Sequence, residues 1–253
     1  MLAVGLALLF GLTGPGGGHA AADDFTIENS VYDGRDLIGR STTIFAGDKA
    51  YDLLTNPDEA ILFDLAGDRI TLVDNVRRVR CDLSAAEVAE FCDGVRNRAR
   101  ASGNESLRFA ADPEFRESLD PETNEIVLAG TWLEYRARAV APKSAEDLKR
   151  YEAFVLRQAQ LNTLINPGAP PPAARLKLNE ALARRQQLPE QVSLRRISAE
   201  TGGGKSLRAE HHYTWRLGDP DRQRIAAVEQ NLPIYKSVPF GAYRDGLTKA
   251  ARR

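Results

Sequence analysis

Residues 43–74 read TIFAGDKAYDLLTNPDEAILFDLAGDRITLVD, a stretch in which apolar runs alternate with short turn signals. Gly47-Asp48, Asn56-Pro57-Asp58 and Gly67-Asp68 separate runs rich in β-branched and aromatic residues, which is the pattern of consecutive hairpins. The same pattern extends back to Phe25. The sequence therefore predicts an antiparallel meander with strands at 25–32, 37–46, 49–54, 59–66 and 69–74.

Two glycine-containing turns also predict strand register. A two-residue loop at Gly67-Asp68 pairs Phe63 with Leu72, which gathers apolar side chains on one face of the hairpin. A two-residue loop at Gly203-Gly204 has the same effect near the C-terminus, whereas a one-residue slip destroys the match. The pairs that this second loop predicts are Val192 with Trp215, Leu194 with Tyr213 and Arg196 with His211.

Helix signals follow the meander. Ser84 and Glu87 form an S-x-x-E capping box, and Ser144 opens a second helix with apolar residues at helical spacing. Further helices are predicted at 173–187 and from Asp219-Pro220 onward, with strands at 106–110, 125–130 and 131–140. An extended tail is expected at about 233–253, docked through Tyr235, Phe240 and Tyr243. This order of elements indicates an α+β fold with a large antiparallel sheet.

Composition narrows the class of protein. The chain has 253 residues, of which 43% are hydrophobic, and 34 basic residues nearly balance 35 acidic ones to give a net charge of -1. The hydrophobic fraction is typical of a globular protein. A nucleic-acid-binding protein usually carries a basic excess or a basic stripe. No nucleic-acid partner is therefore expected.

The N-terminus has the features of an export signal. An apolar run from Leu2 to Leu12 is followed by the glycine-rich breaker 14–18 and by Ala20 and Ala22 in an A-x-A cleavage pattern, although no basic residue precedes the run. The run is too short to cross a bilayer as a helix. We expect residues 1–22 to be a signal peptide and 23–253 to be a single periplasmic or secreted domain that does not span the membrane.

Two cysteines, Cys81 and Cys92, leave two alternatives open. An exported protein meets an oxidising compartment, so a disulfide between them is chemically allowed. However, Cys92 lies about 12 Å along the axis of the first predicted helix, and a bridge requires the preceding segment to fold back along that helix. The other alternative is two small, buried thiols.

The sequence offers no convincing catalytic or metal-binding motif. The segment 199–206 approaches a phosphate-binding loop, but Ala199 replaces the first glycine and a strand follows where a helix is needed. His211 and His212 are adjacent on a predicted strand and thus point to opposite faces. We expect no catalytic residue, no metal and no cofactor. An exported hydrolase using His211 or a carboxylate pair is the least favoured alternative.

Residues 43–54, 59–64 and 69–74 resemble the meander of LolA/LppX-like envelope proteins, and the order of elements is similar over most of 25–230. The resemblance implies a curved, unclosed antiparallel half-barrel covered by helices. Well-studied members of that superfamily shield lipid chains in the concave face. The resemblance contains no diagnostic motif, so no binding residue carries over from the family.

These observations lead to two hypotheses about function. The first is a non-enzymatic envelope carrier that binds a lipid or a lipoprotein acyl chain against an apolar face. The second is a solid-core module that docks an envelope protein through Trp132 and Arg136 or through the aromatic tail. The residues expected on the apolar face are Tyr51, Phe63, Leu72, Leu133, Tyr135 and Phe154.

Overall fold

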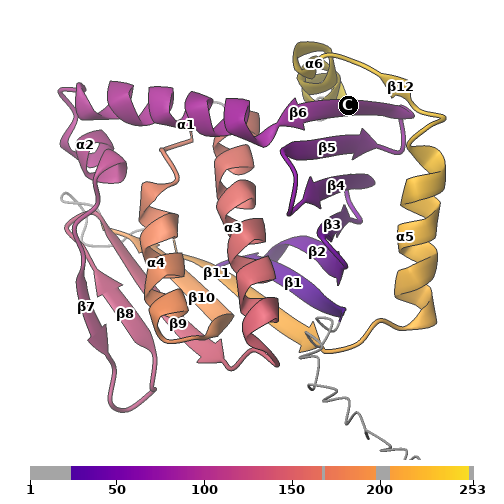
Figure 1. The fold of residues 1–253 in the computed structure, drawn as a ribbon. Coiled ribbons are helices and arrows are strands. Elements are labelled where there is room, and N and C mark those ends of the chain that lie inside the picture. Colours follow the sequence, from indigo (N-terminus) through magenta and orange to yellow (C-terminus); the bar gives the residue numbers. More distant parts are fainter. Residues whose placement is uncertain (1–23, 167–168, 198–205, 251–253) are drawn as a thin grey trace, which may run out of the picture.

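The computed structural model describes residues 24–166, 169–197 and 206–250, which form twelve strands and six helices (Figure 1). The strands are β1 (Phe25–Asp33), β2 (Asp36–Ala46), β3 (Lys49–Leu54), β4 (Glu59–Asp64), β5 (Arg69–Asp74), β6 (Val79–Ser84), β7 (Arg116–Leu119), β8 (Ile126–Ala129), β9 (Leu133–Val140), β10 (Leu188–Arg196), β11 (Ser206–Thr214) and β12 (Lys236–Ser237). The helices are α1 (Ala85–Arg100), α2 (Glu105–Ala111), α3 (Ala145–Ile165), α4 (Ala173–Arg184), α5 (Asp219–Asn231) and α6 (Phe240–Ala250).

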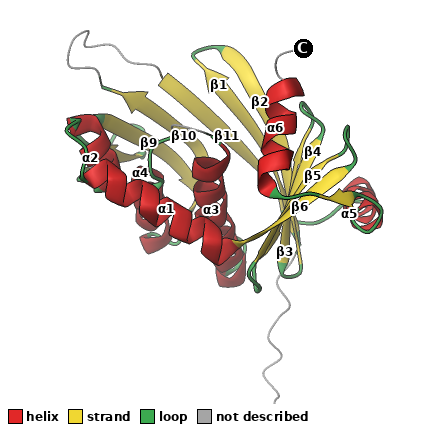
Figure 2. Cartoon of the chain, turned by 90° about the horizontal axis from the view of Figure 1, so that it is seen from above, coloured by secondary structure: helices red, strands yellow, loops and turns green. Residues whose placement is uncertain are grey.

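All the strands belong to one sheet, in the order β12-β6-β5-β4-β3-β2-β1-β11-β10-β9-β8-β7. The meander β1–β6 forms one half and β7–β11 the other, and the antiparallel pair of β1 with β11 joins them. The two edge strands β12 and β7 do not pair with each other, so the sheet is unclosed. Figure 2 shows that the sheet is strongly curved. The structure thus has the α+β fold that the order of elements predicted, and its sheet is unclosed and curved as the resemblance implied.

The two faces of the sheet are covered by different helices (Figure 2). We call the face that α3 and α4 cover the inner face; its buried side chains include Phe25, Ile27, Phe45 and Phe63. The outer face packs against α5 and includes Ile44, Tyr51, Ala60, Leu62 and Val73. Both sets follow the two-residue alternation of a strand, since Ile44 and Phe45 are neighbours on opposite faces.

Local signals placed most elements correctly. The first five strands lie within two residues of their predicted bounds, and the turn at Gly47-Asp48 joins Ala46 directly to Lys49 in the register of a two-residue loop. Ser84 caps α1, where its Oγ accepts from Glu87 N at 3.2 Å. Ser144 caps α3 in the same way, with Asp147 N as the donor at 3.1 Å.

The register predicted for the Gly67-Asp68 hairpin is wrong. Phe63 pairs with Ile70, so the loop has four residues, 65–68. Arg157 of α3 donates to the carbonyl oxygens of Asp64 and Gly67, and the side chain of Asp64 accepts from Gly67 N at 2.8 Å. Contacts from a helix far along the chain therefore set this loop. Because the shift is an even number of residues, each side chain keeps its predicted face.

The register predicted for the last hairpin is also wrong. Val192 pairs with Ala209 and Leu194 with Leu207, whereas Tyr213 pairs with Ile27 of β1. The expected turn at Gly203-Gly204 lies outside the described residues. β11 lies between β10 and β1 and pairs with both strands. Its register therefore depends on the long pairing with β1 as well as on the segment that joins it to β10. The shift is again even, so the apolar residues keep their face.

Two segments have a different secondary structure from the one predicted. Residues 105–111 form α2 rather than a strand, because Asn104 caps the segment by accepting from the backbone N–H of Ser106 and Leu107. The tail expected to be extended contains the helix α6. The aromatic residues in the tail nevertheless dock: Tyr243 is buried in the inner cluster and Tyr235 in the outer one.

The structure contains Cys81 and Cys92 as two buried, free thiols rather than as a disulfide. β6 continues into α1 in nearly the same direction (Figure 1), so the chain does not fold back along the helix as a bridge requires. The thiol of Cys92 faces the carbonyl oxygen of Gln160 on α3 at 3.4 Å instead. The expected signal peptide, 1–22, lies outside the described residues.

Candidate functional site

A cavity of about 310 Å³ lies between the inner face of the sheet and the helices α3 and α4. Strands β1, β2 and β11 form one wall. Its apolar lining consists of Ile27, Val31, Tyr151, Phe154, Val155, Ala159 and Ala209. Its polar lining consists of Asn29, Ser41, Gln158, Asn162, Arg175 and His211. The cavity thus combines an apolar surface with a small set of polar groups, as ligand pockets commonly do.

Simple periodicities bring these side chains together. On β1, residues 27, 29 and 31 share the inner face because strand side chains alternate. On α3, residues 151, 154, 155, 158, 159 and 162 lie on one face because they recur at three- and four-residue spacing. β11 contributes His211 and Ala209, which pair with Asn29 and Val31.

A chain of hydrogen bonds crosses the inner face beside the cavity. Asn29 Nδ2 donates to Ser41 Oγ at 3.2 Å and to Thr43 Oγ1 at 2.9 Å. Thr43 Oγ1 donates in turn to Asp52 Oδ1 at 3.0 Å, and Gln158 Nε2 of α3 reaches Asp52 Oδ2 at 3.4 Å. Burial raises the pKa of Asp52, and the hydrogen bonds partly oppose that shift. These bonds satisfy polar groups that would otherwise be costly to bury.

His211 lies at the end of this chain. Its Nδ1 is 2.8 Å from Asn29 Oδ1. Because the amide nitrogen of Asn29 is already the donor to two hydroxyl groups, its oxygen accepts, and Nδ1 of His211 carries the proton. Burial, and then the positive charge of Arg175, hold the pKa of His211 at about 3, below its usual 6.5. The imidazole is therefore neutral at pH 7, and its buried Nε2 has no hydrogen-bond partner among the described residues.

The six residues predicted for the apolar face do not form one site. Phe154 lines the cavity. Phe63 and Leu72 lie in the same inner cluster but are fully packed, whereas Leu133 and Tyr135 belong to a second cluster beneath α4. Tyr51 lies on the outer face, where its hydroxyl donates to Glu229 Oε1 at 2.6 Å.

The sequence analysis missed Asn29 and Arg175, and it placed His211 opposite Arg196 rather than opposite Asn29. One signal was present: Asn29 interrupts the apolar positions Ile27 and Val31 on the same face of a strand. A polar residue on an apolar face needs a buried partner or a cavity.

Arg136, on the surface proposed to dock a protein partner, forms ion pairs with carboxylates of this chain. Arg136 Nη1 lies 3.0 Å from Asp120 Oδ2 and 3.2 Å from Glu125 Oε2. Trp132, beside it on the chain, is partly exposed.

Two further properties of the described residues bear on the site. No group of three or more His, Cys, Asp or Glu side chains within them is arranged to hold a metal ion. None of the helices in that part of the chain combines the length and apolar character needed to cross a membrane.

Comparisons with known proteins add little to this picture. Neither the known protein families nor the curated proteins contain a match to this sequence. Among solved structures, the chain is similar to a LolA superfamily protein from Nitrosomonas europaea, with 8% identity and a TM-score of 0.28. The likeness covers 79% of this chain and 88% of that one. At this TM-score the likeness says nothing about function.

Proposed function

We propose that this protein is an exported, non-enzymatic envelope protein that binds a lipid or a lipoprotein acyl chain in the inner-face cavity. The observation that carries the proposal is the cavity of about 310 Å³ between the concave face of the sheet and α3 and α4. This space combines buried apolar side chains with a few polar groups at fixed positions, which is the usual composition of a ligand pocket.

The lining of the cavity suits an apolar chain with a polar end. Ile27, Val31 and Val155 offer aliphatic surface, while Asn29 and His211 offer polar groups at fixed positions. The volume is at the lower end of the range for ligand pockets, roughly 300–1,000 Å³. It therefore favours one acyl chain over a lipid with several chains.

The polar groups favour binding over catalysis. His211 hydrogen-bonds to the amide of Asn29 rather than to a carboxylate, and its pKa of about 3 lies far below the pH range in which a general base works best. The proposed export rests on the apolar run, the breaker and the A-x-A pattern of residues 1–22.

The direct test is purification of the protein without detergent, followed by organic extraction and mass spectrometry. We expect a stoichiometric amphipathic small molecule in the extract. A clean extract from well-folded protein that also fails to take up added lipid contradicts the proposal and favours the solid-core module.

A matched pair of variants ties the ligand to the cavity. Ala159 lines it, so Ala159→Phe occupies roughly half of the space and is expected to weaken lipid uptake strongly while the protein stays folded. Ala227→Phe adds the same ring to the exposed surface of α5 and should leave uptake unchanged. Equal uptake by both variants would place the ligand elsewhere.

A further inference from the structure

Arg175 places a positive charge in the wall of the cavity. It lies in the first turn of α4, and its Nε donates to Asn179 Oδ1 at 3.1 Å. Within the described residues, no ion pair joins Arg175 to an Asp or Glu side chain. Most other arginines along the inner-face helices differ: Arg184, for example, forms an ion pair with Glu117 at 2.6 Å.

The titratable groups on which Arg175 acts electrostatically include three that are neutral at pH 7. Its charge acts on His211, Tyr151 and Tyr213. Burial raises the pKa of both tyrosines and lowers that of His211, so none of the three carries a charge that could balance the guanidinium. In addition, α4 has no acidic residue in its first turn and no side-chain cap. A helix N-terminus of this kind adds to the positive potential.

We propose that the cavity selects an acid: a single-chain amphipathic ligand whose anionic head pairs with Arg175 and whose chain lies against Ile27, Val31 and Val155. This inference rests on the proposed function and names its ligand class. A guanidinium group matches the geometry of a carboxylate and binds it through two parallel hydrogen bonds. An anion also supplies the ion-pair partner that the described residues do not give Arg175.

The volume limits the length of the chain. A cavity of about 150 Å³ holds a benzene molecule in a well-studied protein. The cavity of about 310 Å³ is roughly twice as large, so it accommodates a medium chain of about ten carbons. Decanoate and 1-decanol are suitable probes because they share the chain and differ in the charge of the head.

The test is calorimetric titration of the delipidated protein with decanoate and with 1-decanol at pH 7.5. For the wild type we expect decanoate to bind roughly tenfold or more tightly than 1-decanol, the usual effect of a charge-assisted hydrogen bond. Arg175→Gln should remove that preference, so that decanoate and 1-decanol bind the variant with similar affinities. Arg175→Lys keeps the charge and should keep part of the preference.

Lys177→Gln is the control, because it removes one positive charge from the same helix at an exposed position outside this cavity. It should retain the full preference for the acid. Equal affinities for the two probes in the wild type, or an unchanged preference in Arg175→Gln, overturn the inference while the proposed function stands. Failure of the wild type to bind either probe counts against both proposals.

Discussion

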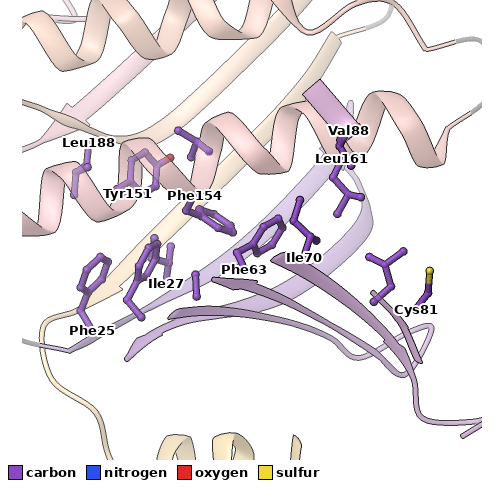
Figure 3. Packing of buried hydrophobic residues seen from close by; sticks show 14 of the residues in the cluster. Phe25, Ile27, Phe63, Ile70, Cys81, Val88, Tyr151, Phe154, Leu161 and Leu188 are labelled. Atoms are coloured by element: carbon purple, nitrogen blue, oxygen red, sulfur yellow. The ribbon is translucent and has the colours of Figure 1, made fainter. Parts of the chain in front are cut away.

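The space between the inner face and α3 is solid at one end and hollow at the other. Under the meander, Phe25 stacks on Phe45 with ring centroids 4.3 Å apart. Phe154 packs edge-on against Phe45 at 5.4 Å and against Phe63 at 5.2 Å. Figure 3 shows Phe25, Phe63 and Phe154 in this cluster. Beneath β1 and β11 the same helix faces a cavity instead. Phe154 belongs to both regions and marks the boundary between them.

Side-chain size accounts for much of the difference. The solid end receives three phenylalanine rings from β1, β2 and β4. The hollow end receives no phenylalanine from the described strands, and Asn29, Ser41 and Ala209 are among the sheet residues that line it. Small and polar side chains leave volume unfilled, and their hydrogen bonds hold them in place. The comparison teaches that one sheet and one helix can form a packed core at one end and a pocket at the other.

The largest effect is expected at the solid end. Phe63→Ala removes a fully buried ring and leaves a void among close-packed neighbours, which should lower the free energy of unfolding by about 3–5 kcal/mol. Val31→Ala at the hollow end enlarges a space that already exists and should cost less than about 1 kcal/mol. Urea denaturation of both variants measures the contrast, and similar losses would show that the two ends are packed alike.

Adding volume should also distinguish the two ends, and the solid end should again lose more stability. Ala50 is fully buried and pairs with Phe45 and Phe63, so Ala50→Phe overpacks the core and is expected to cost about 1–3 kcal/mol or more. Ala159→Phe places the same ring into the cavity and should cost less than about 1 kcal/mol. Thermal unfolding of the two proteins tests this, and a large loss in Ala159→Phe would argue against an accessible cavity.

The smallest effect concerns pH at the hollow end. Burial and Arg175 lower the pKa of His211 to about 3 in the folded protein, against 6.5 for the ordinary side chain. The unfolded chain therefore binds this proton more readily, so the stability is fully present above pH 6.5 and is lost as the pH falls toward 3.

Between pH 7 and pH 5 the wild type should lose about 1–2 kcal/mol more stability than His211→Asn, which has no titrating imidazole at this position. His212 is exposed and adjacent, so His212→Asn serves as the control and should behave as the wild type does. Urea denaturation at the two pH values measures the difference. Parallel losses in all three proteins would mean that His211 titrates normally.

The elements that the sequence predicted well are those with local causes. Turn residues and a two-residue apolar period define the meander. Ser84 and Ser144 each cap a helix by accepting a hydrogen bond from the backbone N–H three residues further along the chain. The errors arise where distant contacts compete with local rules. Arg157 of α3 donates a hydrogen bond to the loop at Gly67. Tyr213 of β11, which the local hairpin rule paired with β10, pairs with Ile27 of β1.

The sequence pattern predicted little of the candidate site. Phe154 was expected there and lines the cavity, but Arg175 and Asn29 were not singled out. The hydrogen bond between His211 and Asn29 joins residues 182 positions apart. No periodicity or motif in either strand indicates that the two strands are neighbours.

The sequence by itself determined which segments are strands and helices and which side chains share a face, because propensity, capping and side-chain period act over a few residues. The tertiary structure alone decided which strands meet, how the loops between them close and where side chains leave a cavity. A cavity is volume that several elements fail to fill when they pack. Its shape, and the position of Arg175 in its wall, therefore depend on contacts between residues far apart in the chain.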